Sequence, residues 1–213
     1  MRIQSHFMFC LIVLTAASAF AAEPFQMELK DVKLGELPKG WKAAKTHEGH
    51  GSVWKVLEDS TAPGGKALAQ TSADGPKALF NLCIAEETKF ADVDVSVSLK
   101  ANAGKIDRGG GPIWRCRDAD NYYVARWNPL EDNFRVYKVE KGKRTQLGTA
   151  DVKLPGDKWH VVRAVQKGGG IQCYLDGKLY LDVKDDTFPN AGKIGLWTKA
   201  DAQTSFAELT AKE

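Results

Sequence analysis

Arginine, aromatic and amide side chains recur at every second position in the middle of this chain. They occur in residues 113–117, 122–128 and 134–137, and a further tryptophan follows at position 197. Flat aromatic rings fit the apolar C–H faces of sugars, while arginine and asparagine donate several hydrogen bonds to hydroxyl, carboxylate or sulfate groups. The pattern therefore favours contacts to a polyhydroxylated or acidic sugar.

A spacing of two places such side chains on one face of a strand, because alternate residues of a β-strand point to opposite sides. If Trp114 and Cys116 point into a core, Arg115 points away from it. The same reasoning, with Tyr123, Phe134 and Leu196 taken as core residues, assigns the residues of the other segments to the inner or the outer face of their strands. The resulting candidate residues for ligand binding are Arg115, Tyr122, Arg126, Asn128, Arg135 and Trp197.

Within this set, Arg126 is expected to contact ligand rather than to stabilise the scaffold. We expect it to be partly solvated, with Arg115 approaching it across the turn at residues 118–121. Removing the Arg126 side chain would then weaken binding and leave the melting temperature almost unchanged. The alternative is that both arginines pair with nearby acidic residues and order the loops. For Trp197, the alternative to contact with ligand is burial in the core.

The sequence does not assign catalytic residues. A retaining glycosidase needs two carboxyl groups about 5–5.5 Å apart. The nearest acidic pattern, at residues 92–96, fits better as the polar side of an amphipathic strand. If Arg115 or Arg126 polarised a substrate carbonyl, a general base would also be needed. The candidates, among which no spacing selects, are Asp118, Asp120, His160 and Asp201.

No cofactor or metal site is expected. The segment His47-Glu48-Gly49-His50 lacks the His-Glu-x-x-His spacing of a zinc-binding helix, and we interpret it as a loop. Nothing in the sequence supports bound calcium, which is left open. The formal charge of +3 over 213 residues is also too balanced to favour a nucleic-acid partner, which would show a concentrated basic stripe.

The elements that must position these side chains are expected to be strands. Asp176-Gly177 lies between two alternating runs and predicts a two-residue hairpin turn, because both residues tolerate a positive φ. We expect this hairpin to bury Cys173, Leu175, Leu179 and Leu181 on one side. Other strands are expected at residues 52–57, 66–71, 78–84, 91–99, 112–117, 122–127, 134–139, 159–166, 193–198 and 205–209.

Strands this frequent, joined by Gly, Pro and Asp turns, predict an all-β fold built as an antiparallel sandwich. The one helix-compatible stretch, residues 85–88, is at most a turn. Cys83, Cys116 and Cys173 each fall inside or beside an expected strand. One disulfide with one free thiol and three buried thiols both fit, and we favour three buried thiols because free cysteine behaves as a small apolar residue.

The first 21 residues resemble an export signal. Arg2 precedes an apolar stretch that is too short to span a bilayer, and Ala19-Phe20-Ala21 has the small-x-small pattern of a cleavage site. We therefore expect a signal peptide at residues 1–21 and a single domain at residues 22–213. That domain would lie in the periplasm or outside the cell, without membrane insertion.

Two segments carry a family resemblance. Residues 110–126, which include Gly-Gly-Pro-Ile-Trp-Arg and Asn-Tyr-Tyr-Val-Ala-Arg, and residues 195–201, Gly-Leu-Trp-Thr-Lys-Ala-Asp, resemble motifs of laminin-G-like, concanavalin A-like jelly-roll domains. Within that superfamily the chain most resembles bacterial secreted domains grouped with 3-keto-disaccharide hydrolases and described as similar to family 16 glycoside hydrolases. The Phe-Asp-Asp common near the end of such domains is Phe-Ala-Glu at residues 206–208.

Three functional hypotheses follow. The first is an exported jelly-roll domain that recognises carbohydrate. The second, implied by the resemblance, is a glycoside hydrolase that acts on 3-keto-glycosides or related disaccharides. The third is a non-catalytic, laminin-G-like adhesion module that binds a protein partner.

The export hypothesis makes a direct prediction. Mass spectrometry of the protein from the native envelope or medium should give an N-terminus near Ala22, because cleavage is expected after Ala21. An intact Met1 on protein from the cytosolic fraction would contradict it.

Overall fold

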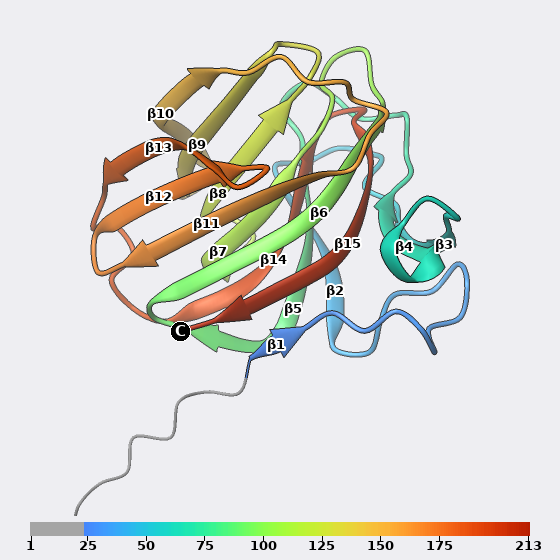
Figure 1. Ribbon diagram of the computed structural model, residues 1–213, viewed down its shortest axis with the longest axis horizontal. Helices are drawn as coiled ribbons and strands as arrows, with labels where there is room; N and C mark the ends of the chain where they lie inside the picture. Colours follow the sequence, from blue (N-terminus) through green and yellow to red (C-terminus); the bar gives the residue numbers. More distant parts are fainter. Residues whose placement is uncertain (1–23) are drawn as a thin grey trace, which may run out of the picture.

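The computed structural model describes residues 24–213, which form two antiparallel sheets packed face to face (Figure 1). Sheet A has the spatial order β13 (Lys178–Lys184), β12 (Gly170–Leu175), β11 (His160–Lys167), β6 (Val93–Ala103), β15 (Gln203–Lys212), β4 (Lys66–Gln70) and β3 (Trp54–Glu58), with β1 (Phe25–Gln26) beside β15. Sheet B has the order β10 (Lys143–Asp151), β9 (Asn133–Glu140), β8 (Asn121–Asn128), β7 (Gly111–Asp118), β14 (Gly192–Lys199), β5 (Phe80–Phe90) and β2 (Trp41–Thr46).

The expected all-β antiparallel jelly-roll sandwich is confirmed. The predicted signal peptide lies outside the described residues.

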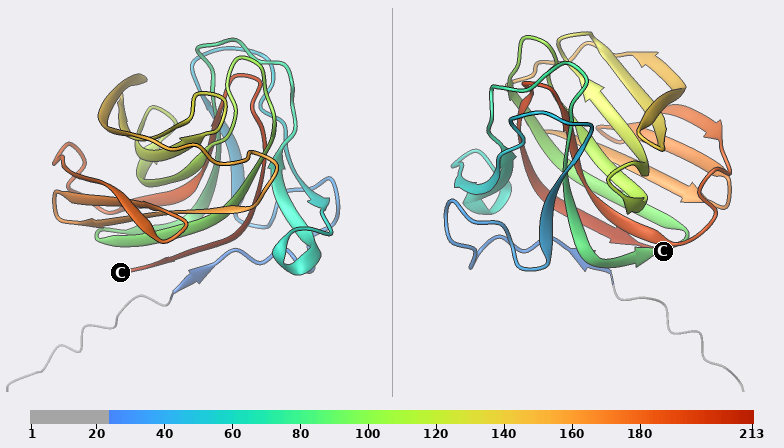
Figure 2. Two further views of the ribbon diagram at one scale, coloured as in Figure 1. Left: turned by 45° about the horizontal axis from the view of Figure 1, so that its top comes forward. Right: turned by 180° about the vertical axis from the view of Figure 1, so that it is seen from behind.

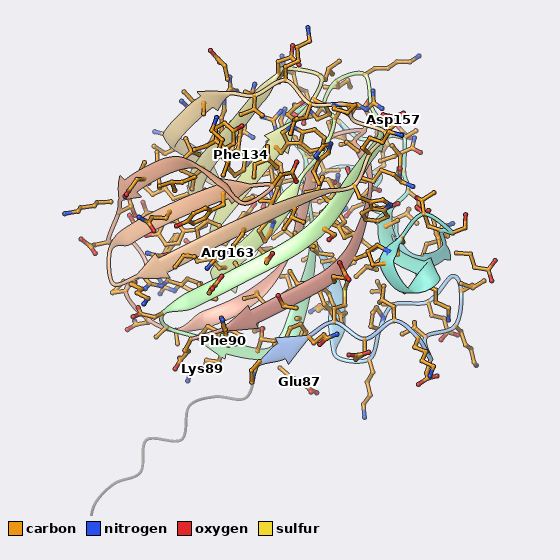
Figure 3. The ribbon with its side chains drawn as sticks, in the orientation of Figure 1. Glu87, Lys89, Phe90, Phe134, Asp157 and Arg163 are labelled. Atoms are coloured by element: carbon orange, nitrogen blue, oxygen red, sulfur yellow. The ribbon has the colours of Figure 1, made fainter. Side chains whose placement is uncertain are left out.

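Alternation along the strands builds the main core between the sheets. In β6, Val95, Val97 and Leu99 are fully buried in this core, while Asp94 and Ser96 between them are partly exposed. Phe134 of β9 enters the same core from sheet B (Figure 3). Each such apolar side chain contributes roughly 1.5–3 kcal/mol by leaving water.

Sheet B carries a second apolar cluster on the face turned away from sheet A, which we call the outer cluster. It is formed by Phe80, Leu82, Ile84, Ile113, Cys116, Tyr122, Val124, Tyr137, Val139 and Trp197, all buried. The curvature of the sheet, seen in the tilted view of Figure 2, explains how one layer can bury both of its faces. Thr46 at the end of β2 lies 2.8 Å from the Tyr122 hydroxyl of β8, although three strands separate β2 from β8 in the sheet.

Both edge strands of sheet B were missing from the sequence-based expectation. An edge strand is paired on one side and can be largely polar, so β2 and β10 lack a clear hydrophobic alternation. In β10 a register shift between Gln146 and Gly148 also interrupts the pattern. The expected helical turn at residues 85–88 is wrong as well, because β5 continues through it to Phe90. Ala85 pairs with both β14 and β2, and a register shift then carries β5 on to Phe90, which pairs with Gly192.

The hairpin between β12 and β13 has the predicted turn. Asp176 and Gly177 have φ values of 49° and 78°, and Leu175 pairs with Lys178 across them. Cys173, Leu175 and Leu181 are buried as expected, but Leu179 is 43% exposed. The reason is a bulge, since the pairing shifts between Cys173 and Tyr174 and turns Leu179 to the solvent side.

Cys83, Cys116 and Cys173 are all buried free thiols. Burial raises the pKa of each thiol, that of Cys116 to about 12, so they are held as neutral apolar groups. Within residues 24–213, no helix is long and apolar enough to cross a bilayer. The same part of the chain contains no group of three or more His, Cys, Asp and Glu side chains that could hold a metal ion.

The hairpin turn provides a test of the fold. Replacing Gly177 with valine should destabilise the protein by roughly 1–3 kcal/mol, because a β-branched residue resists a positive φ. Urea denaturation would measure the change, with Lys178→Val as the control at an exposed strand position. Equal midpoints for the two variants would contradict this turn geometry.

Candidate functional site

Five of the six predicted ligand-binding residues meet on the outer face of sheet B. Tyr122, Arg126 and Asn128 come from β8, Arg135 from β9 and Trp197 from β14. β8 and β9 pair in register, with Arg126 directly opposite Arg135, so these two side chains share a face. The sequence alternation thus placed these five residues on the correct side of their strands.

A buried carboxylate organises one end of this face. Asp107, in the loop before β7, is 1% exposed and accepts hydrogen bonds from Arg126 Nη2, Asn128 Nδ2 and Lys199 Nζ, each at 3.1 Å. Because its charge is met by two cations and an amide, the carboxylate can remain buried without a large desolvation penalty. Asp107 was not predicted, since it lies outside any strand and alternation cannot orient it.

Asp201 fixes the loop that carries Asp107. Its carboxylate accepts the backbone N–H groups of Lys105, Ile106 and Asp107 at 2.7–3.0 Å. Burial alone would raise the pKa of Asp201, but these N–H donors outweigh it and hold the pKa below its usual value. Asp201 is therefore an anion held in a ring of backbone amides, and its oxygens are occupied.

The rim of the face is partly solvated. Glu131 Oε2 accepts a hydrogen bond from Arg135 Nη1 at 3.1 Å and lies 3.4 Å from Arg126 Nη2. The side chains of Arg135 and Glu131 are 31% and 39% exposed. Arg135 Nε also donates to Thr149 Oγ1 of β10 at 3.2 Å. A ligand can reach this rim without displacing the buried network beneath it.

Arg144 of β10 lies over the aromatic part of the outer cluster. Its guanidinium carbon is 4.4 Å from the ring centre of Tyr137, 5.1 Å from that of Phe80 and 5.9 Å from that of Trp197. Trp197 Nε1 in turn donates to the Tyr122 hydroxyl at 3.1 Å. Burial lowers the pKa of Arg144, consistent with a cation that has lost much of its hydration.

Arg144 was missed because the strand that carries it was missed. The sequence did contain an indication of this strand. Lys141-Gly142 follows the strand predicted at residues 134–139 and forms a two-residue turn with φ values of 51° and 77°. Glu140 and Lys143 pair across it, and Arg144 then lies opposite Val139 of the outer cluster. Had this turn been recognised, alternation would have placed Arg144 on the same face as Arg126.

Arg115 does not belong to this face. It has a φ of 44° within a bulge of β7, where the pairing with β8 shifts between Trp114 and Asp118. As a result Trp114 faces the main core and Cys116 the outer cluster, so the expectation that they point the same way is wrong. The bulge needs Gly192 beside it, because a Cβ there would lie 2.5 Å from the carbonyl carbon of Arg115.

The side chain of Arg115 has a structural role. It is 2% exposed and donates to the carbonyl oxygens of Ala91 and Phe188 at 2.7 and 2.9 Å. These bonds tie the β5–β6 turn and the segment before β14 to β7. The expected pairing of Arg115 with Arg126 is therefore wrong, and the register of β7 and β8 separates the two by four residues, about 13 Å.

The environment of Arg126 also differs from the expectation. It is 1% exposed rather than partly solvated, and it bridges Asp107, Glu131 and the Tyr137 hydroxyl. Its Nε atom is buried without a hydrogen-bond partner among the described residues. Arg126 is thus part of the support beneath the rim.

Three of the four candidate general bases are engaged in structural contacts, whereas Asp120 is exposed and its carboxylate accepts no hydrogen bond from the described residues. His160 contacts Asp176 Oδ2 through Nδ1 at 2.7 Å and the Pro155 carbonyl through Nε2 at 3.0 Å, and its ring packs on Trp127. Asp118 accepts the backbone N–H of Asp120 at 2.8 Å within the β7–β8 turn.

Comparison with solved structures identifies the same fold in carbohydrate-associated proteins. The chain is similar to the carbohydrate-binding module CBM66 from Bacillus subtilis, with a TM-score of 0.64 and 21% identity over 82% of this chain and 96% of that one. It is also similar to domain 4 of AbnA, a GH43 extracellular arabinanase from Geobacillus stearothermophilus solved with arabinotriose, with a TM-score of 0.52 and 13% identity over 80% and 82% of the two chains.

A Bacillus subtilis protein of unknown function with a galectin-like fold is a further match, with a TM-score of 0.53 and 13% identity over 82% of this chain and 89% of that one. No protein-family model matches the sequence, and no curated protein matches it. At these identities the comparisons establish the fold, a galectin-like jelly-roll sandwich.

The burial of Arg126 reverses the stability prediction made from sequence. Arg126→Ala should lower the free energy of unfolding by about 3 kcal/mol, because it removes one of two cations from the buried Asp107. Arg135→Ala, which removes a partly exposed arginine from the same network, should cost about 1 kcal/mol or less. Equal unfolding midpoints in urea for Arg126→Ala and the unmodified protein would contradict this assignment.

Proposed function

We propose that this protein binds carbohydrate at the rim of the outer face of sheet B. The observation that carries the proposal is the placement of Arg135 and Arg144 on neighbouring strands of one curved sheet, with Glu131 in the β8–β9 loop beside Arg135, above a layer of buried side chains. Guanidinium and carboxylate groups held in this way can donate to and accept from neighbouring sugar hydroxyls at once.

The buried layer beneath the rim makes the site rigid before a ligand arrives. Tyr137 links the two parts of the face, because its hydroxyl lies 3.4 Å from Arg126 Nη1 while its ring supports Arg144. A preorganised site loses less side-chain entropy on binding, which raises affinity without additional contacts. Since Trp197 and Tyr122 are fully buried, we assign them to this support rather than to direct stacking on a sugar.

Two further lines support a carbohydrate ligand. The fold is that of CBM66 and of the arabinanase domain solved with arabinotriose. The sequence motifs at residues 110–126 and 195–201 independently resemble secreted carbohydrate-active jelly-roll domains. Export through the predicted signal peptide would place the protein in the periplasm or outside the cell, where polysaccharides and their fragments are found.

Hydrolysis of 3-keto-glycosides is the alternative that the sequence resemblance suggests. Three of the four candidate bases, His160, Asp118 and Asp201, are engaged in structural hydrogen bonds, which favours binding over catalysis. An adhesion module that ignores glycans is the other alternative. A glycan-binding experiment distinguishes both alternatives from carbohydrate binding.

A glycan array followed by calorimetry would test the proposal. Arg135→Ala should weaken binding by ten- to hundredfold, because charge-assisted hydrogen bonds are worth about 1.5–3 kcal/mol. The matched control is Arg163→Ala on the exposed face of sheet A (Figure 3), where Arg163 is 41% exposed and paired with Asp94. The control variant should bind as the unmodified protein does.

Three results would contradict the proposal. Binding that is lost in Arg163→Ala and retained in Arg135→Ala would move the site to sheet A. Release of reducing sugar from a bound glycan would identify an enzyme rather than a binding module. Absence of binding across the array would favour the adhesion alternative.

A further inference from the structure

Arg144 lacks a counter-ion among the described residues. None of the ion pairs within residues 24–213 includes it. Its Nη1 atom is buried without a hydrogen-bond partner, and its contacts are the faces of Tyr137, Phe80 and Trp197. Cation–π contacts recover part of the lost hydration energy, but they leave the N–H donors of the guanidinium unused.

The carboxylates on this face are already committed to other groups. Asp107 is engaged by Arg126, Asn128 and Lys199, and Glu131 by Arg126, Arg135 and Asn133. The network with Arg144 therefore holds four cations against two carboxylates. Burial is the main cause of the lowered pKa of Arg144, and the charge of Arg126 lowers it further, while Asp107 offsets part of the effect.

We propose that the carbohydrate bound at this rim carries an anionic group, a carboxylate or a sulfate, which Arg144 binds. The inference rests on the proposed function and specifies the chemistry of its ligand. A guanidinium offers paired N–H donors that match two oxygens of such a group. Arg135 lies on the neighbouring strand, four residues along β9 from Val139, the pairing partner of Arg144, so the two cations face different parts of the rim.

The aromatic floor strengthens this anion site. Phe80, Tyr137 and Trp197 exclude water from one side of the Arg144 guanidinium, so an anion on its open side interacts at a lower effective dielectric than in bulk water. The three rings also limit the positions that the guanidinium can take. Arg144 is thus oriented for a ligand anion in a way that a freely moving surface arginine is not.

The experiment compares acidic sugars with neutral partners of the same skeleton. One pair is a galacturonic acid trisaccharide and its methyl ester, and the other is a sulfated galactose oligosaccharide and its unsulfated form. Calorimetry on the full mature chain should show at least tenfold tighter binding of the acidic member of one pair. The pair that shows the preference distinguishes a carboxylate from a sulfate ligand. Affinity should fall between 50 and 500 mM salt, as expected of a charge-based contact.

Variants of Arg144 then assign the preference to this side chain. Arg144→Gln should abolish the preference for the acidic sugar, and Arg144→Lys should retain part of it, because a lysine keeps the charge without the paired donors. Arg163→Gln on sheet A is the matched control and should retain the full preference. Because Arg144 has no ion pair to lose, we expect the melting temperature of Arg144→Gln to stay within a few degrees of the unmodified protein. If this variant does not fold, the acid-against-ester comparison on the unmodified protein still tests the proposal.

The outcomes separate this inference from the proposed function. Equal affinity for acidic and neutral members of both pairs would overturn the inference and leave carbohydrate binding intact. A preference that survives in Arg144→Gln would also overturn it. Failure of every sugar to bind the unmodified protein would overturn both.

Discussion

The candidate site depends on one buried charge. Asp107 lies beneath the outer face of sheet B with 1% of its surface exposed, and it holds Arg126, Asn128 and Lys199 from two different strands. A buried carboxylate is tolerated only where donors surround it, so these side chains have little freedom to move. Asp201 in turn fixes the loop of Asp107 through three backbone amides. The orientation of the rim above follows from this network.

The curvature of sheet B turns what would be an open face into a layered site. Its concave side fills with the outer cluster, and the contact of Thr46 with Tyr122 shows how far the edge strand β2 reaches. Aromatic side chains that alternation places outward are therefore supports rather than platforms. The polar groups left accessible, Arg135 and Glu131, are attached to this support and remain able to meet a ligand.

Carbohydrate binding and catalysis require different chemical groups on such a surface. A binding module needs fixed hydrogen-bonding groups, and the rim provides them. A hydrolase needs an unengaged acid or base near the reacting atoms. Asp201 and His160 are held in contacts with the scaffold, and among the predicted bases Asp120 is the one whose carboxylate is free of hydrogen bonds to the described residues. Arg144 differs from both groups, since it is a partly desolvated cation without an ion-pair partner among residues 24–213. The proposed anionic ligand would supply that partner.

The sequence by itself determined the all-β fold, the Asp176-Gly177 turn and the faces of β8, β9 and β14, because strand alternation and turn chemistry are local properties. It failed for Arg115 and Leu179, where a bulge interrupts the alternation of side chains along the strand. It also missed Arg144, whose edge strand has no clear alternation. Tertiary structure alone decided how exposed each outward residue is. The burial of Arg126 and Trp197 results from the curvature of sheet B and from Asp107 in a distant loop, and neither can be read from the local pattern.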